Sequence, residues 1–427
     1  MTLSSASQNQ IRITFITSKS FSQVPSGRLD NIDLLRGLVM VIMLIDHMRD
    51  YVLEGVFISN PLKPETTTAW LYITRWITHL CAPTFVLLAG VSTGIQALRG
   101  VSRSELSRFL WTRGLWLVFL ELVVVRSLMW FNWNLSFVGL LQVIWAIGCS
   151  MLGLSVLVRL PMRSVGIIGL VIVAGHNLLD PVQVPIWKGP DSAAPTFFQA
   201  LWITLHQAGP FSLGSWPAPV VFVMYPVLPW LGVIAMGYGF AEVFGLEPDR
   251  RRRILIRVGW GMLALFFVLR WGNLYGDPLP WTPYATITQT IMSFMNVQKY
   301  GPSLLYMLVT LTPGLILLAW LEGRPLTHSI ARVLVTFGRV PMFYYLLQWA
   351  AAHVAGILVS LCLGKEILFY FLNYVQLVTM DPMPSMGGPL WMVYACWAIS
   401  LPILYLPCRW YADLKARRKD LAILRYL

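Results

Sequence analysis

The sequence predicts an all-α protein: a polytopic membrane bundle of about ten transmembrane helices with both termini in the cytoplasm. Composition, apolar runs and the distribution of positive charge all support this. Of the 427 residues, 57% are hydrophobic and only 12% are charged, and the mean hydropathy is +0.65. A soluble globular chain carries about 25% charged residues. The low charge therefore excludes a soluble enzyme, a disordered chain and a disulfide scaffold.

Ten runs are apolar and long enough, at roughly 20 residues, to cross the hydrocarbon core as helices. The fifth run is short, and the ninth begins with a stretch expected to lie partly at the membrane interface. In chain order the runs are about 34–53, 69–98, 109–131, 138–160, 163–179, 218–243, 254–272, 302–321, 333–362 and 389–411.

The connectors between these runs set the orientation. If the N-terminus is cytoplasmic, 24 of the 32 Lys and Arg residues fall on the cytoplasmic side, four fall on the opposite loops and four lie within or at the outer ends of spans. This is a strong positive-inside pattern. The net charge of +13 is thus an orientation signal, with some contact to anionic lipid, and does not indicate a nucleic-acid partner.

The chain divides into three parts. Residues 1–27 are rich in Ser, Thr and Gln and are expected to form a disordered cytoplasmic tail, 28–411 form the membrane domain, and 412–427 form a basic cytoplasmic tail. Two outer loops, about 180–217 and 273–301, are long and aromatic. They are expected either to form a lid or acceptor surface or simply to pack at the interface.

Ionisable residues inside membrane spans usually mark function, and the first span carries several. Arg36 and His47 are eleven residues apart, which puts them within about 20° of one helical face and about 16 Å apart along the axis. This separation suits an extended cofactor, with its phosphate at Arg36 and its reactive end at the depth of His47. A neutral imidazole there could accept a proton, with Asp46 or Asp50 orienting the ring. The alternative is that 46–50 is merely a polar helix end.

The second span adds Arg75 and His79, one helical turn apart on one face. His79 is expected near the depth of His47, but the spacing of the two histidines is not that of a metal site, and the five cysteines show no metal-ligand spacing either. No metal is therefore expected. His79, His176 and His353 could instead make helix–helix hydrogen bonds. For Glu121, Arg126 and Arg270, buried pairing and catalysis remain open, and no motif of a serine hydrolase, NTPase or dinucleotide enzyme is present.

Several segments resemble a known family. They are RLDNIDLLRG at 28–37 followed by Met43 and DHMRD at 46–50, YPVLPW at 225–230, NVQKYGPSL at 296–304, FGRVPMFYY at 337–345, and CRWY at 408–411. Together they are similar to a bacterial membrane-protein family named for the heparan-alpha-glucosaminide N-acetyltransferase catalytic domain, within the transmembrane acyltransferase superfamily.

The resemblance implies a multi-helix bundle in the bacterial inner membrane. It also implies transfer of an acetyl or other acyl group from cytoplasmic acyl-CoA to a sugar-like, or other hydroxyl or amine, acceptor on the outer side. In this interpretation His47, Asp46 and His79 are the catalytic residues, and Arg36 and Arg75 bind the cofactor. The alternatives are a secondary transporter or exporter of a small or lipid-linked molecule, and a membrane scaffold. The acceptor and the oligomeric state are left open.

Overall fold

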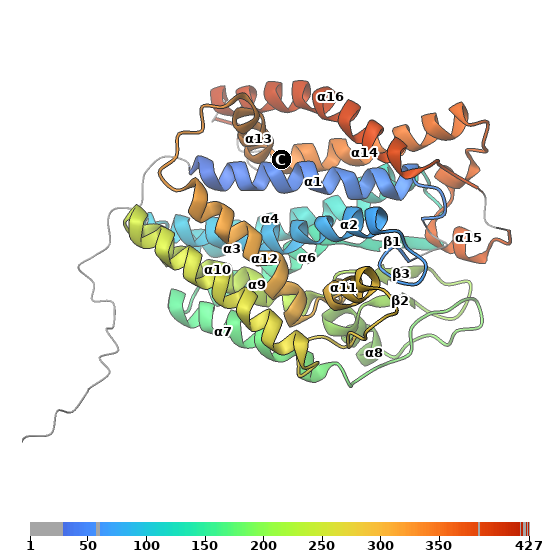
Figure 1. Ribbon diagram of the computed structural model, residues 1–427, viewed down its shortest axis with the longest axis horizontal. Coiled ribbons are helices and arrows are strands. Elements are labelled where there is room, and N and C mark those ends of the chain that lie inside the picture. The colour runs from blue at the N-terminus through green and yellow to red at the C-terminus, as the bar shows by residue number, and fades with distance from the viewer. Residues whose placement is uncertain are drawn as a thin grey trace, which may run out of the picture.

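The computed structural model describes residues 29–418 apart from 57–59 and 383–384, together with 420, 421, 424 and 426. The tail predicted over 1–27 lies outside the described residues. The described chain is mostly helical and includes one small three-stranded sheet. Its longest helices run roughly along the long axis of the molecule (Figure 1).

Each of the ten predicted runs contains helix. The first run is α1 (Asp30–Val52), the second is α2 (Ala69–Ile77) continued through η2 (Thr78–Leu80) into α3 (Cys81–Leu98), and the third is α4 (Arg103–Phe119) continued through the π-helical turn η3 (Leu120–Val125) into α5 (Arg126–Trp130). The later helices are α6 (Val143–Leu157), α7 (Met162–Gly175) with η4 (His176–Leu179), α8 (Phe197–Trp202) with the π-helical turn η5 (Ile203–Gln207), α9 (Val227–Phe240) with η6 (Ala241–Gly245), α10 (Pro248–Trp271), α11 (Ile287–Met295), α12 (Leu304–Leu321), α13 (Ser329–Arg339), α14 (Pro341–Cys362), η7 (Leu368–Phe371), α15 (Tyr374–Thr379) and α16 (Leu390–Arg417).

Within the described residues, seven helical segments are long and apolar enough to cross a membrane: Ala69–Leu98, Met162–Leu179, Val227–Gly245, Pro248–Trp271, Leu304–Leu321, Pro341–Cys362 and Leu390–Arg417. The other three runs contain helices that are more charged or shorter. The helix α1 carries six charged side chains, α4 begins with a charged first turn, and α6 has only 15 residues. The count of ten therefore stays a prediction.

The prediction of an all-helical chain was wrong at the start of two runs. Run 138–160 opens with β1 (Phe137–Leu141) and run 218–243 with β3 (Val220–Val223), which are paired in parallel; β2 (Gly209–Ser212) is antiparallel to β3. Their aromatic and β-branched residues favour strands. A short apolar run does not distinguish a strand from a helix by itself, so the hydropathy pattern concealed the sheet.

Two other boundaries differ from the predicted runs. The ninth run divides into α13 and α14 at Val340, which has a non-helical backbone conformation with φ −129° and ψ 50°. The residue before a proline avoids the helical conformation, and Pro341 follows Val340. The last run is longer than predicted, because α16 continues through Arg417. The first six residues of the predicted tail, 412–417, are therefore helical.

The helix α1 is central and packs against α3, α13, α14 and α16. Its contact with α13 is very close. A Cβ on Gly37 would collide with the carbonyl oxygen of Leu334, and one on Gly338 would collide with that of Asp33. Small residues permit such close approach of membrane helices. The contact brings the backbone of Gly338 within reach of Arg36.

The two ends of the bundle differ in character. At one end, called here the loop end, the sheet and the short helices α8 and α15 gather, toward the right in Figure 1. At the other, called here the basic end, α4, α7 and α10 begin near Arg103, Arg163 and Arg250. Each end contains a cavity.

Candidate functional site

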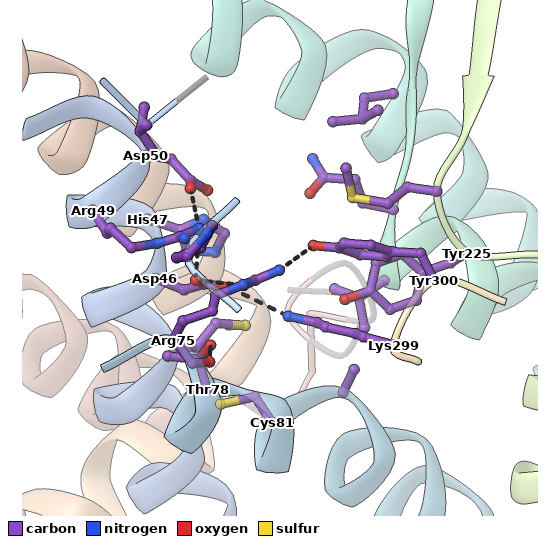
Figure 2. Close-up of a pocket in the computed structure, with 18 of the residues that line it drawn as sticks. Asp46, His47, Arg49, Asp50, Arg75, Thr78, Cys81, Tyr225, Lys299 and Tyr300 are labelled. Atoms are coloured by element: carbon purple, nitrogen blue, oxygen red, sulfur yellow. Dashed lines mark hydrogen bonds and ion pairs between the residues drawn. The ribbon is translucent and has the colours of Figure 1, made fainter. Parts of the chain in front are cut away.

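The larger cavity lies at the loop end and has a volume of about 720 Å³. Figure 2 shows polar side chains of α1 and α2 on one side of it and those of the segment 296–301 on the other. Its charged lining residues are Asp46, Arg49, Asp50, Arg75 and Lys299. The cavity is therefore polar although it lies within an apolar bundle.

Asp46 is the centre of this charge network. Its two carboxylate oxygens each accept a hydrogen bond from Nη1 of Arg75 at 2.6 Å. Nη2 of Arg49 lies 3.1 Å from Oδ1, and Nζ of Lys299 lies 3.4 Å from Oδ2. Successive residues point about 100° apart on a helix, so Asp46 faces these cations and does not hydrogen-bond to the neighbouring His47. A role for Asp46 in orienting that ring has no direct contact to support it.

The segment 296–301 closes the network from the opposite side. Nη2 of Arg75 donates to the hydroxyl of Tyr300 at 2.7 Å. The segment is fixed by Asp277, whose Oδ2 accepts from the backbone N–H of Gln298 at 2.9 Å and from Ser303 Oγ at 2.6 Å. Burial raises the pKa of Asp277, and these two hydrogen bonds oppose that effect. Part of the loop 273–301, which is predicted to face outward, thus lines the cavity.

Lys299 was not singled out by the sequence analysis. It lies 253 residues from Asp46 along the chain, so no local spacing links the two. One signal was available: Lys299 is one of only four Lys and Arg residues assigned to the outer loops. A buried lysine in such a position needs a carboxylate partner.

The imidazole of His47 lines the same cavity and is only 7% exposed. Its ring lies 3.8 Å, centre to centre, from that of Trp349 on α14. Among the described residues, neither ring nitrogen has a hydrogen-bond partner. A buried imidazole facing a polar cavity with unengaged nitrogens is suited to accept a proton from a bound ligand.

Two other sequence-predicted residues lie away from the positions expected for them. His79 lines neither this cavity nor the one at the basic end; its Nδ1 is 2.9 Å from the carbonyl oxygen of Trp76, and its ring packs against Tyr306. Arg75 lies with Asp46 at the loop end and does not line the same cavity as Arg36. The structure therefore brings His47, Asp46 and Arg75 to one cavity and separates His79 and Arg36 from it.

The second cavity, at the basic end, has a volume of about 300 Å³. Its charged lining residues are Arg36, Arg113, Arg339 and Lys415, and among the described residues no acidic side chain lines it. Arg36 is held by Asp33 Oδ1 at 2.9 Å, Ser92 Oγ at 3.1 Å and the carbonyl oxygen of Gly338 at 3.2 Å. The four positively charged side chains that line this cavity come from four different helices.

The two cavities meet inside the bundle, since Met43, Val143 and Tyr345 line both. Arg36 and His47 were expected in one groove on α1; they lie in adjoining cavities on either side of this junction. The hydroxyl of Tyr345 is buried and has no hydrogen-bond partner in the described part of the chain.

The buried charges whose roles the sequence left open, Glu121, Arg126 and Arg270, contact backbone groups, and Arg270 also lies 3.9 Å from Asp277. Glu121 accepts from the N–H of Trp145 at 3.1 Å, Arg126 donates to the carbonyl oxygens of Asn134 and Phe137, and Arg270 donates to those of Leu279, Phe294 and Asn296, among others. His353 lies 3.1 Å from the carbonyl oxygen of Leu128. These contacts satisfy buried groups and connect segments, which is a structural role.

A helical bundle with long apolar helices, and with charged side chains lining a cavity at each end, defines a membrane protein with polar cavities between its helices. The chain belongs to the family described as heparan-alpha-glucosaminide N-acetyltransferase, catalytic, whose profile matches residues 28–272. This confirms the family indicated by the sequence and implies a membrane acyltransferase. The match includes Arg36, His47 and Arg75, whereas Lys299 and Tyr345 lie beyond it. No curated protein matches the chain.

Proposed function

We propose that the protein transfers an acyl group, acetyl in the simplest case, from cytoplasmic acyl-CoA to a hydroxyl or amine of a sugar-like acceptor on the outer side of a bacterial inner membrane. The observation that carries this proposal is the pair of cavities that open toward opposite ends and share Met43, Val143 and Tyr345. Family membership supports the reaction class. The positive-inside pattern supports ten spans with the basic end and both termini in the cytoplasm.

The basic-end cavity binds the donor. Coenzyme A carries several phosphate charges, and Arg36, Arg113, Arg339 and Lys415 supply the cations that a polyanion requires. Hydrogen bonds between guanidinium and phosphate are charge-assisted and stronger than neutral ones. With its phosphates at this end, the flexible pantetheine arm reaches along α1 and brings the thioester to the junction at Tyr345.

The loop-end cavity binds the acceptor. Its charges are nearly balanced, since Asp46 and Asp50 oppose Arg49, Arg75 and Lys299. A balanced set of donors and acceptors suits a neutral polar ligand such as a sugar. In this assignment Arg75 acts on the acceptor and not on the cofactor, and Asp46 acts by holding Arg75 and Lys299 in position. His79, which lines neither cavity, supports Tyr306 instead.

His47 performs the proton transfers. Its neutral imidazole removes a proton from the acceptor O–H or N–H as the oxygen or nitrogen attacks the thioester carbonyl carbon. The carbonyl oxygen gains the negative charge of a tetrahedral intermediate and is met by the hydroxyl of Tyr345. Collapse of the intermediate breaks the C–S bond, and the thiolate takes the proton back from the imidazolium. The products are acylated acceptor and free CoA.

The test is acceptor-dependent release of CoA thiol by the purified full chain in detergent, with acetyl-CoA and a panel of amino sugars and neutral sugars. An acyltransferase releases thiol and forms an acylated sugar that mass spectrometry detects. A transporter, the second function compatible with cavities at both ends, would release no thiol and would accumulate the sugar in proteoliposomes in response to a gradient. That second result would contradict the proposal.

A further inference from the structure

A third polar cluster lies at the loop end, away from both cavities. It comprises His176 in η4, Asp180 just after it, and His206 in η5. In Figure 1 the end of α7, which continues into η4, lies near α8, which continues into η5. One ligand atom of each of the three side chains lies within 4.8 Å of those of the other two.

The histidines of this cluster are buried without adequate partners. His176 and His206 are only 4% and 5% exposed. Nε2 of His206 lies 3.1 Å from Oδ1 of Asp180. The other three ring nitrogens, which are both nitrogens of His176 and Nδ1 of His206, have no hydrogen-bond partner in the described part of the chain. Burying polar nitrogens without partners is unfavourable, and coordination of an ion would remove this cost.

The carboxylate of Asp180 is held in position by Asn177. Nδ2 of Asn177 donates to its Oδ2 at 2.8 Å, and Oδ1 of Asn177 accepts from the backbone N–H of Leu304 at 2.8 Å. Metal ligands are typically fixed by such outer contacts, which leave the other carboxylate oxygen for the ion. Here that oxygen is the one facing His206.

The geometry points to a binding site for one divalent transition-metal ion, with Zn²⁺ the best fit, held by His176, Asp180 and His206. Two imidazole nitrogens and one carboxylate favour such an ion over Mg²⁺ or Ca²⁺, which prefer oxygen ligands. Tetrahedral zinc with bonds of about 2.0–2.1 Å holds its ligand atoms about 3.3 Å apart. The side chains would therefore have to close by only about 1.5 Å. Asp180, with a quarter of its side chain exposed, leaves a fourth position open to water.

The sequence predicted no metal because the spacing of His47 and His79, and that of the cysteines, is not that of a metal site. The relevant spacing is instead a histidine and an aspartate four residues apart, joined by a histidine 26 residues later. A bound ion would connect the end of α7 to η5. It would also support the segment 299–304, because Asn177 bonds Leu304 and the backbone of Gly301 lies beside the carbonyl oxygens of His206 and Gln207.

The experiment measures metal bound by the purified full chain in detergent, with any polyhistidine tag removed. The protein is stripped with EDTA, dialysed against Zn²⁺ or Mg²⁺ alone, and analysed by elemental mass spectrometry and thermal unfolding. The expected result is about one Zn²⁺ per chain with a raised Tm, and no such effect of Mg²⁺. Retention of no Zn²⁺ by the folded wild-type chain would overturn the inference.

Variants locate the ion. His176→Ala and His206→Ala are expected to lose the zinc and the Tm increase, whereas His328→Ala, at an exposed histidine of the basic end, keeps both. Asp180→His offers three imidazoles and retains zinc, which distinguishes lost ligation from lost folding. Asn177→Ala weakens binding by about 10- to 100-fold. If His176→Ala and His206→Ala bound as much zinc as the wild-type chain, the ion would be bound elsewhere and the proposed site would be refuted. These outcomes are independent of acyl transfer.

Discussion

The two cavities differ in how their charges are compensated. At the loop end, the carboxylate of Asp46 contacts Arg75, Arg49 and Lys299 within 3.4 Å. At the basic end, the lining charges among the described residues are all positive, and Arg36 is paired with Asp33 behind it. A cavity of one sign selects a charged ligand, whereas a balanced one selects by hydrogen bonding. In the proposed function, this difference places the anionic donor at the basic end and a neutral acceptor at the loop end.

The largest expected effect comes from His47, the proposed general base. His47→Ala should lower the turnover number by about 10²- to 10⁴-fold, the usual contribution of general base catalysis, while acyl-CoA still binds with its wild-type Kd. Thiol release and isothermal titration measure the two quantities. His328→Ala serves as the matched histidine control. Wild-type turnover in the folded His47→Ala protein would remove the base from the mechanism.

The second prediction concerns only the binding of acyl-CoA at the basic end. Arg36→Ala should weaken acyl-CoA binding by about 10- to 100-fold, because a hydrogen bond to a charged group contributes about 1.5–3 kcal/mol, and should leave the KM for the acceptor unchanged. Arg36→Lys keeps the positive charge but loses the planar guanidinium group. Its Kd for acyl-CoA should therefore lie between those of the wild type and Arg36→Ala. If the acceptor KM rises instead, the donor and acceptor ends have been assigned in reverse.

A third prediction tests the loop end alone. Lys299→Met removes one of three cations from Asp46 and should raise the acceptor KM about tenfold, with a small loss of thermal stability. Lys188→Met, at an exposed lysine of the loop 180–217, is the control. An increase in the Kd for acyl-CoA with no change in the acceptor KM would contradict the assignment.

Sequence reasoning succeeded where the information is local. Hydropathy located the helical runs, and the spacing of Arg36 and His47 on α1 identified one residue in each cavity. It failed where partners meet only in three dimensions. Lys299 reaches Asp46 from a distant loop, His206 joins His176 from another helix, and His79, one turn from Arg75, faces a different environment. Helical periodicity fixes which residues share a face but not which other segment covers that face.

The smallest expected effects come from a matched pair of hydroxyl deletions, one at each end. Ser92→Ala removes the hydroxyl that holds Nη2 of Arg36, and Tyr300→Phe removes the one that holds Nη2 of Arg75. Neither hydroxyl contacts a ligand in the proposed function, and each acts only by positioning an arginine. The loss should therefore be no larger than that of an ordinary hydrogen bond, about 0.5–1.5 kcal/mol, which weakens the binding of one ligand by about two- to tenfold. Ser92→Ala should act only on acyl-CoA and Tyr300→Phe only on the acceptor, with additive effects in the double variant because the two hydroxyls bind different arginines. If either change altered both constants, the two cavities would be one coupled site, and the separation of donor and acceptor along α1 would fail.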